Sequence, residues 1–262
     1  MAIDKMKNTM NKVWPNPGFL SGRTALVTGG ARRLGRHLAK ALAEQGADIV
    51  LHYSGSEFEA SATCSELENR GAKVVLLQTD LEDAFLAEDL IYRASDALEK
   101  PVDILINNAA MFGPGSAHET DDQLWNEYHH VNLRAPFLLA RGMADTLADD
   151  SRGDVINLND FRALRPCADN FAYTMSKWGL HGLTRNLALA LAPKVRVNEL
   201  ALGAVMPPNP GDGQYNHTTR EEIPIGRFVT PQEVCTAMLF LLANESMTGE
   251  TLNLDGGQNL TG

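Results

Sequence analysis

The sequence predicts an α/β fold in which helices cover both faces of a parallel sheet. Short β-rich runs alternate along the chain with segments of helical length. A turn that contains Gly29, Gly30 and Gly35 separates the first such run from the first such segment. Because connections between parallel strands are short and right-handed, this alternation predicts a doubly wound sheet whose ligands bind beyond the carboxyl ends of the strands.

Length, charge and cysteine usage narrow the class of protein. The chain has 262 residues, of which 44% are hydrophobic and 21% charged, as in one soluble domain. Its formal charge of −10 argues against nucleic acid or an anionic membrane surface as a partner. Cys64, Cys167 and Cys235 lack metal-binding spacing, so we expect no metal site and a reducing cytoplasm. We expect residues 1–20 to be an extension without a signal peptide's apolar core, and residues 21–262 to form the domain.

The first half of the chain supplies four predicted strands. They cover residues 23–28, 48–53, 73–78 and 102–107, and the segments 57–70 and 84–99 between them have helical length. Another predicted helix begins near Arg36, because apolar residues recur there at helical spacing, and it ends at Gly46, a residue typical of helix ends.

The turn after the first strand predicts a dinucleotide site. Strand, glycine turn and helix form the start of a Rossmann unit, in which free N–H groups and the helix dipole favour a pyrophosphate at the helix N-terminus. A tight turn without a ligand is the alternative interpretation. The candidate cofactor-binding residues of this turn are Gly29, Arg32, Arg33, Leu34 and Gly35.

The end of the second strand favours NADP over NAD. Proteins that bind NAD usually carry an acid about twenty residues past the glycine turn, which holds the ribose 2′-hydroxyl. Here the strand ends in Tyr53 and Ser54, and no acid occurs before Glu57. Arg32 and Arg33 can pair with an additional phosphate, because guanidinium groups bind phosphate strongly.

Residues after the later strands are further candidates for cofactor contacts, because the carboxyl ends of parallel strands meet at one edge of the sheet. These candidates are Asp80, Leu81, Asn108, Ala109, Ala110, Leu158, Gly203 and Val205.

The second half of the chain adds helices, strands and a long loop. We expect a helix over 121–147, strands over 153–158, 194–200 and 251–254, and a helix that begins after Thr230 with proline at its first position. The proline- and glycine-rich segment 203–226 is typical of an active-site lid.

Tyr173 and Lys177 are the candidates for proton transfer. They are four residues apart at the start of a predicted helix, so their side chains point to the same side. A cation beside a phenol favours the phenolate, which predicts a lowered tyrosine pKa and proton exchange near neutral pH. An ordinary surface helix is the alternative. Asn132 lies in an apolar stretch and must find partners, for example in a structural hydrogen bond to a neighbouring turn.

Five motifs in this order resemble the short-chain dehydrogenase/reductase family. They are Thr28-Gly29…Gly35, Asn107-Asn108-Ala109, Asn132, Tyr173…Lys177 and Thr248-Gly249…Asp255-Gly256-Gly257. The resemblance implies a Rossmann-like seven-stranded parallel sheet, a nicotinamide cofactor and commonly a homotetramer. It also implies that Tyr173 donates the proton and Lys177 holds the nicotinamide ribose and eases loss of that proton. Asn132 would keep a water in the relay.

Two departures from the family pattern are similar to its pteridine reductase branch, which includes the dihydromonapterin and dihydrobiopterin reductases. Asp160 stands thirteen residues before Tyr173, where the family has serine, and Arg33 replaces the middle glycine of the turn. Phe112 stands where that branch stacks an aromatic ring on the pterin. Ala110 in place of the branch's usual serine, and Leu202 in place of the usual proline before glycine, leave the substrate open.

The leading hypothesis is therefore an NADPH-dependent reductase of a pterin or similar flat heterocycle, with Phe112, Asp160 and Tyr173 as substrate contacts. The first alternative is a carbonyl reductase or alcohol dehydrogenase of 3-oxoacyl or keto substrates. An ionised aspartate argues against a plain ketone, because it cannot donate a hydrogen bond to the carbonyl oxygen. The alternative from another class is a non-catalytic NADP-binding sensor.

Overall fold

The computed structural model describes residues 15–206 and 220–261. It contains a seven-stranded, entirely parallel sheet with the strand order β3-β2-β1-β4-β5-β6-β7. The predicted doubly wound α/β fold is thereby confirmed. The strands are β1 (Thr24–Val27), β2 (Asp48–Tyr53), β3 (Val74–Gln78), β4 (Ile104–Asn107), β5 (Gly153–Asp160), β6 (Val195–Leu202) and β7 (Thr251–Leu254).

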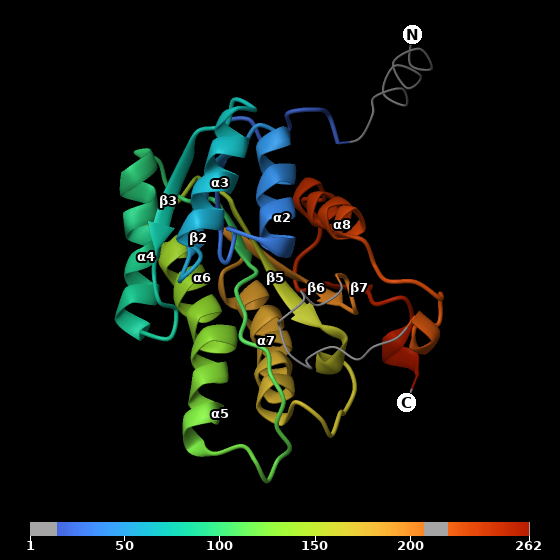
Figure 1. Cartoon of the computed structure of the whole chain (residues 1–262). Coiled ribbons are helices and arrows are strands. Elements are labelled where there is room, and N and C mark those ends of the chain that lie inside the picture. The colour runs from blue at the N-terminus through green and yellow to red at the C-terminus, as the bar shows by residue number, and fades with distance from the viewer. Residues whose placement is uncertain (1–14, 207–219, 262) are drawn as a thin grey trace.

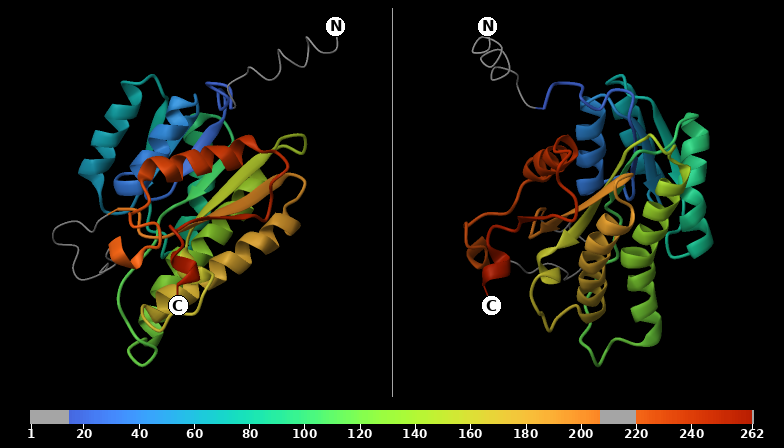
Figure 2. Two further views of the ribbon diagram at one scale, coloured as in Figure 1. Left: turned by 90° about the vertical axis from the view of Figure 1, so that its right-hand side faces the viewer. Right: turned by 180° about the vertical axis from the view of Figure 1, so that it is seen from behind.

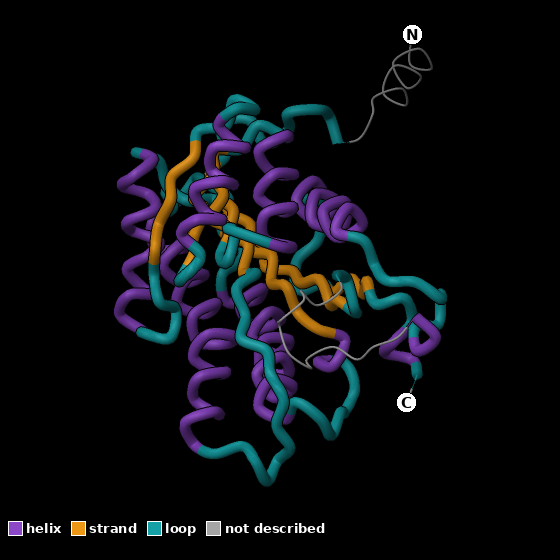
Figure 3. The backbone as a smooth tube through the Cα atoms, in the orientation of Figure 1, coloured by secondary structure: helices purple, strands orange, loops and turns teal. Residues whose placement is uncertain are grey.

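Helices cover both faces of this sheet (Figure 1). They are α2 (Arg33–Glu44), α3 (Glu57–Glu68), α4 (Ala84–Leu98), α5 (Asp122–His129), α6 (Ala135–Thr146), α7 (Phe171–Ala190) and α8 (Pro231–Ala243). One apolar core joins the sheet to α2, α3 and α8, and a second joins it to α4, α6 and α7. The sheet therefore lies as a middle layer between two layers of helices, as the rotated views and the tube drawing show (Figures 2 and 3).

The long helix expected over 121–147 is two α-helices joined by a π-helical turn, His130–Arg134. Asn132 lies in this turn and is 1% exposed. Its side chain forms hydrogen bonds to Met111, in the loop after β4. Single π-turns of this kind are frequent at functional sites.

Several predicted element ends agree with the structure, and others differ. Gly46 follows α2 with a φ of +92°, a left-handed conformation that glycine adopts without steric cost. Thr230 caps α8, which begins at a proline as predicted. By contrast, α2 begins at Arg33 rather than near Arg36, and β5 continues to Asp160 instead of ending at 158.

The expected lid, 203–226, lies largely outside the described residues, as do residues 1–14 of the expected extension. Within the described ranges, no helix combines the length and apolar character that crossing a membrane requires. The same residues contain no grouping of histidine, cysteine or acidic side chains suited to hold a metal ion.

Candidate active site

The glycine turn between β1 and α2 leaves a helix N-terminus open at the carboxyl edge of the sheet. A Cβ atom at Gly35 would lie 2.1 Å from the Gly29 carbonyl oxygen, so the turn can close this tightly only with glycine there. Arg32 is the N-cap of α2, and its own side chain makes no capping hydrogen bond. An anion at this position would lie at the positive end of the helix dipole, close to the backbone N–H groups of the first turn.

Arg33 has a φ of +50°, which lies in the left-handed region that glycine adopts most easily. It occupies the position where the family pattern has glycine. The backbone therefore keeps the conformation of the glycine turn, and the arginine adds a cation at a conformational cost.

His52 connects the glycine turn to the end of β3. Its Nδ1 accepts a hydrogen bond from the Gly29 N–H at 3.1 Å, and its Nε2 donates to the Thr79 carbonyl at 3.0 Å. Burial lowers the pKa of His52 to about 4, so the neutral ring keeps one donor and one acceptor. His52 was not among the residues predicted for the site, although its position next to Tyr53 at the strand end could have indicated a role.

Asn108 binds the end of β4 to the same turn. Its Nδ2 donates to the Thr28 carbonyl at 2.8 Å, and the Asn108 and Ala109 N–H groups donate to Thr28 Oγ1 at 2.9 and 3.0 Å. Ala110, the next residue, is exposed. These bonds hold the loop after β4 against the glycine turn, so both line one edge of the sheet.

The remaining cofactor candidates also lie after strand ends, with their side chains in different surroundings. Ser54 is exposed, whereas Leu81 is buried and Val205 packs against the apolar core. Leu81 and Val205 could therefore contact a cofactor mainly through their backbone. At Gly203 a Cβ atom would lie 2.2 Å from Gln258 Oε1, which explains the glycine.

Tyr173 and Asp160 form a direct hydrogen bond. The Tyr173 hydroxyl donates to Asp160 Oδ2 at 2.7 Å, and the Arg162 N–H donates to Asp160 Oδ1 at 2.9 Å. Lys177 is 4% exposed and donates from Nζ to the Leu158 carbonyl at 2.8 Å. The Lys177 Nζ lies 5.8 Å from the centre of the Tyr173 ring. Phenol, carboxylate and ammonium thus lie together where β5 meets the start of α7.

The predicted lowering of the tyrosine pKa is wrong for this arrangement. Burial raises the pKa of Tyr173 well above 10, and the Asp160 carboxylate adds to the rise. Burial also lowers the pKa of Lys177 to about 8, so its ammonium loses a proton more easily than that of an exposed lysine. Tyr173 is held as a neutral phenol, which is a proton donor rather than a base.

Asn132 makes structural hydrogen bonds to a neighbouring loop, which was one of the two roles considered for it from the sequence. Its Oδ1 accepts from the Met111 N–H at 2.8 Å, and its Nδ2 donates to the Met111 carbonyl and to Ser176 Oγ, each at 3.0 Å. Ser176 Oγ donates in turn to the Tyr173 carbonyl at 2.7 Å. Asn132 therefore fixes the loop before Phe112 relative to the helix that carries Tyr173.

A pocket of about 180 Å³ opens beside the Tyr173 hydroxyl. Phe112 stands edge-on to the Tyr173 ring, with centroids 4.7 Å apart and planes at 90°. The pocket brings together four predicted residues, and it adds three that the sequence analysis did not assign. Its lining consists of Phe112, Asp160, Phe161, Arg162, Tyr173, Gly203 and Ala204. The sequence Asp-Phe-Arg immediately after a strand was the available signal for the arginine.

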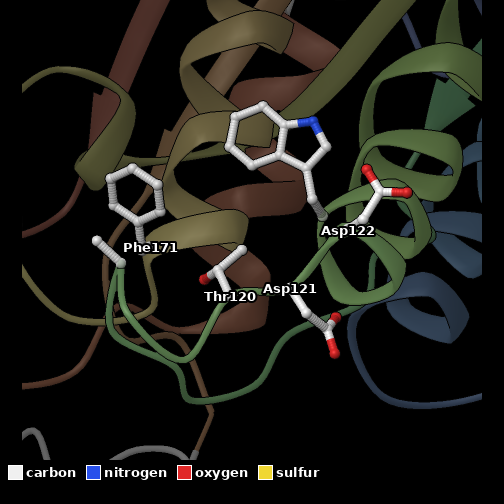
Figure 4. A pocket seen from close by; sticks show the side chains of 6 residues that line it. Thr120, Asp121, Asp122 and Phe171 are labelled. Carbon is white, nitrogen blue, oxygen red and sulfur yellow. The ribbon is translucent and has the colours of Figure 1, made fainter.

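A larger hollow, of about 390 Å³, lies at the start of α5 and contains none of the predicted site residues (Figure 4). Thr120, Asp121, Asp122 and Phe171 surround it. The Asp121 carboxylate accepts a hydrogen bond from the Leu124 N–H at 2.8 Å and so caps the helix. Volume alone does not identify the chemical site, because the Asp160–Tyr173 pair and Lys177 lie elsewhere.

Comparison with known proteins agrees with this geometry. A family model described as enoyl-(acyl carrier protein) reductase matches residues 29–259. An uncharacterized oxidoreductase of Bacillus subtilis, YmfI, is 28% identical over 90% of this chain and 98% of that protein. The match spans the glycine turn, the Tyr173–Lys177 pair and the last strand, so the chain belongs to the short-chain dehydrogenase/reductase family of oxidoreductases.

Solved structures of two relatives are similar over almost the whole fold. FolM alternative dihydrofolate reductase 1 from Brucella suis, in complex with NADP, has a TM-score of 0.84 and 33% identity, covering 92% of this chain and 96% of that one. A short-chain dehydrogenase from Burkholderia cenocepacia, also in complex with NADP, has a TM-score of 0.85 and 31% identity, covering 92% and 99%.

Proposed function

We propose that this protein is an NADPH-dependent reductase of a pterin or a similar flat heterocycle. The observation that carries the proposal is the Asp160–Tyr173 hydrogen bond of 2.7 Å in a pocket with an aromatic wall. A protonated aspartate at this position is a far stronger acid than the family's usual serine, whose hydroxyl orients a carbonyl by donating a hydrogen bond. The similarity to FolM of Brucella suis supports the same branch.

The residues at the carboxyl edge fit a dinucleotide. The open N-terminus of α2, and the glycines that a Cβ atom would obstruct, suit a pyrophosphate. The absence of an acid at Tyr53–Ser54, together with Arg32 and Arg33 in the turn, favours the additional phosphate of NADP. Both solved relatives bind NADP, which supports this choice.

When bound, NADPH would supply the hydride for the substrate carbon, and the chain's own residues would supply the proton. The Tyr173 hydroxyl, which donates to Asp160 in the present structure, would turn its proton to the substrate nitrogen. A proton taken up by Asp160 would then restore Tyr173 through the same hydrogen bond. The raised pKa of Tyr173 keeps this proton in place before the reaction.

Other residues hold the reacting groups. Lys177 would bind the nicotinamide ribose, and Phe112 would cover one face of the heterocycle. Asn132 would hold the loop before Phe112 in place relative to α7. We further propose that residues 21–262 act as one domain in a cytoplasmic homotetramer. A mass measurement by light scattering tests the tetramer.

The alternative is a carbonyl reductase or alcohol dehydrogenase, and the similarity to a short-chain dehydrogenase from Burkholderia cenocepacia supports it. The experiment compares NADPH oxidation with a dihydropterin and with an aliphatic ketone. Asp160→Ser and Phe112→Ala should damage dihydropterin reduction, and Asp160→Ser should leave or improve ketone reduction. Tyr173→Phe should lower turnover by roughly 10²–10⁴ with little change in cofactor affinity.

Three results would redirect the proposal. Equal losses on both substrates, or no dihydropterin turnover by the unmodified protein, favour the carbonyl reductase. NADPH binding without turnover of either compound favours the non-catalytic sensor. Tyr173→Phe with nearly unchanged turnover would remove the catalytic assignment.

A further inference from the structure

Arg162 lies on the wall of the substrate pocket, next to the Asp160 carboxylate. Two hydrogen bonds fix its backbone, because its N–H donates to Asp160 Oδ1 at 2.9 Å and its carbonyl accepts from Trp178 Nε1 at 2.7 Å. Its guanidinium lies over the Phe161 ring, 4.8 Å from the centroid. The side chain is 15% exposed. Both the backbone and the plane of the guanidinium are thus held in place at the pocket.

The Arg162 guanidinium makes no hydrogen bond to another described residue. Its Nη1 lies 3.5 Å from Asp160 Oδ1 and its Nη2 lies 3.7 Å from Asp169 Oδ2, both longer than an N–H···O bond. Its Nε is buried without a hydrogen-bond partner. Buried donors in native proteins are nearly always paired, and an unpaired one is costly. The neighbouring pocket is the place from which an acceptor could come.

Arg162 and Tyr173 approach opposite oxygens of the Asp160 carboxylate, Oδ1 and Oδ2 respectively. A single planar molecule in the pocket can therefore meet both donors. A guanidinium offers a planar fork that matches oxygen acceptors in the same plane. The rings of Phe112 and Phe161 are the apolar surfaces of this pocket.

We propose that Arg162 is a specificity-determining residue that donates to an oxygen acceptor, a ring carbonyl or a carboxylate, on the substrate. The inference rests on the proposed function, and for a pterin the acceptor is the 4-oxo group. In this arrangement the Tyr173 hydroxyl donates to the ring nitrogen that gains a proton, and the Arg162 guanidinium donates to the oxygen. A ligand with an amino group at that position cannot accept a hydrogen bond from Arg162, because both groups are donors, so Arg162 adds nothing to its affinity.

The test measures the affinity of the NADP-bound protein for two probes, a 2-amino-4-oxopteridine and a 2,4-diaminopteridine. Arg162→Met keeps the apolar stem and removes the donors. It should weaken the oxo probe about tenfold or more, because a hydrogen bond to a charged group is lost. The affinity for the diamino probe should stay within about threefold or increase, because it loses no such bond. Arg162→Lys, which keeps the charge and loses the fork, should give an intermediate loss.

Arg165→Met is the matched control. Arg165 also lies over the Phe161 ring, at 5.3 Å, and its Nε is likewise buried without a hydrogen-bond partner, but it does not line the pocket. This variant should bind both probes as the unmodified protein does. If Arg162→Met unfolds the chain, the comparison is made with Arg162→Lys.

Equal loss of both probes in the Arg162 variants would overturn the inference, because it would mean that Arg162 only fixes Asp160. Failure of the unmodified protein to bind either pteridine would defeat the pterin proposal instead. The same variants are then compared on an oxo acid and its methyl ester. Selective loss of the acid would support the role of Arg162, and equal effects, or no binding of any probe, would overturn it.

Discussion

At the scale of single residues, Arg33 combines an unfavourable conformation with a useful charge. Its φ of +50° costs an L-residue roughly 1–2 kcal/mol, a cost that glycine avoids. A cation next to the open N-terminus of α2 can bind a phosphate in return. The charge of Arg33 supports the proposed preference for NADP. The conformational cost supports it too, because an arginine that only filled space would offer no return for that cost.

Replacing Arg33 separates these two effects. Arg33→Ala and Arg33→Gly both remove the cation, so each should reduce the preference for NADPH over NADH about tenfold or more. Only the glycine variant removes the backbone cost, and its free energy of unfolding should exceed that of the alanine variant by about 1 kcal/mol. Titration with each cofactor and urea unfolding measure the two quantities.

Arg36→Ala is the control for Arg33. Arg36 lies on the same helix, and its side chain pairs with Glu66 on α3 rather than facing the turn. Its loss should leave cofactor preference unchanged. A preference that survives in both Arg33 variants would contradict the assignment of this residue to the phosphate.

Lys177 provides a prediction about pH. Burial lowers its pKa to about 8, although Asp160 and Glu199 act in the opposite direction, whereas an unfolded lysine titrates near 10.4. Between these values the unfolded chain binds a proton that the folded chain lacks, so this group's contribution to stability rises with pH. Lys177→Met removes the dependence. The difference in unfolding free energy, variant minus unmodified protein, should therefore be larger near pH 7 than near pH 10.

Lys100→Met is the control for this titration, because its side chain is 45% exposed and pairs with Asp48 at the surface. The stability difference for this variant should vary less over the same interval. A pH-independent difference for Lys177→Met would show that the ammonium is not desolvated in the folded chain.

The residue types at the site could be predicted from spacing, but their ionisation could not. The four-residue interval correctly placed Tyr173 and Lys177 on one helix, α7. The direction of the tyrosine pKa depends on how deeply α7 packs against β5 and on where Asp160 points. Both depend on tertiary packing, which no local sequence pattern predicts.

At the scale of elements, helix ends were predicted better than helix interiors. Thr230 and Glu233 form a capping box whose signals are local: Thr230 Oγ1 accepts from the Glu233 N–H, and the Glu233 carboxylate accepts from the Thr230 N–H. The π-turn at His130–Arg134 has no such signal. It depends on Asn132 reaching Met111, which lies on a different loop.

The cap of α8 predicts a measurable loss of stability. Thr230→Ala removes the side-chain acceptor and should lower the free energy of unfolding by about 0.5–2 kcal/mol. Thr236→Ala on the same helix is the control, because Thr236 is exposed and bonds only the Gln232 carbonyl within the helix. That change should stay within about 0.5 kcal/mol. Urea unfolding measures both free energies. Equal losses of stability in the two variants would contradict a specific role of the cap.

At the scale of the whole molecule, parallel topology explains why distant motifs meet. The first five strands end on one edge of the sheet, and that edge gathers the glycine turn, the loop after β4 and the Asp160–Tyr173 pair. The alternation of strands and helices was sufficient to predict this. It was not sufficient to predict that Arg162 lines the pocket, because that depends on a single short turn after β5.

The last prediction concerns the stability of the whole fold. A cofactor held by the turns after β1, β2, β4 and β5 binds only the folded chain, so NADPH at about one hundred times its dissociation constant should stabilise it by about 2.7 kcal/mol. For a domain of this size that corresponds to roughly 5–10 °C in melting temperature. If NADH binds about tenfold more weakly, the same concentration should give about half the stabilisation. Melting curves test this, and Arg33→Ala should bring the two shifts together. Equal shifts for NADPH and NADH in the unmodified protein would contradict the NADP preference, and no shift with either would contradict a dinucleotide site at this edge of the sheet.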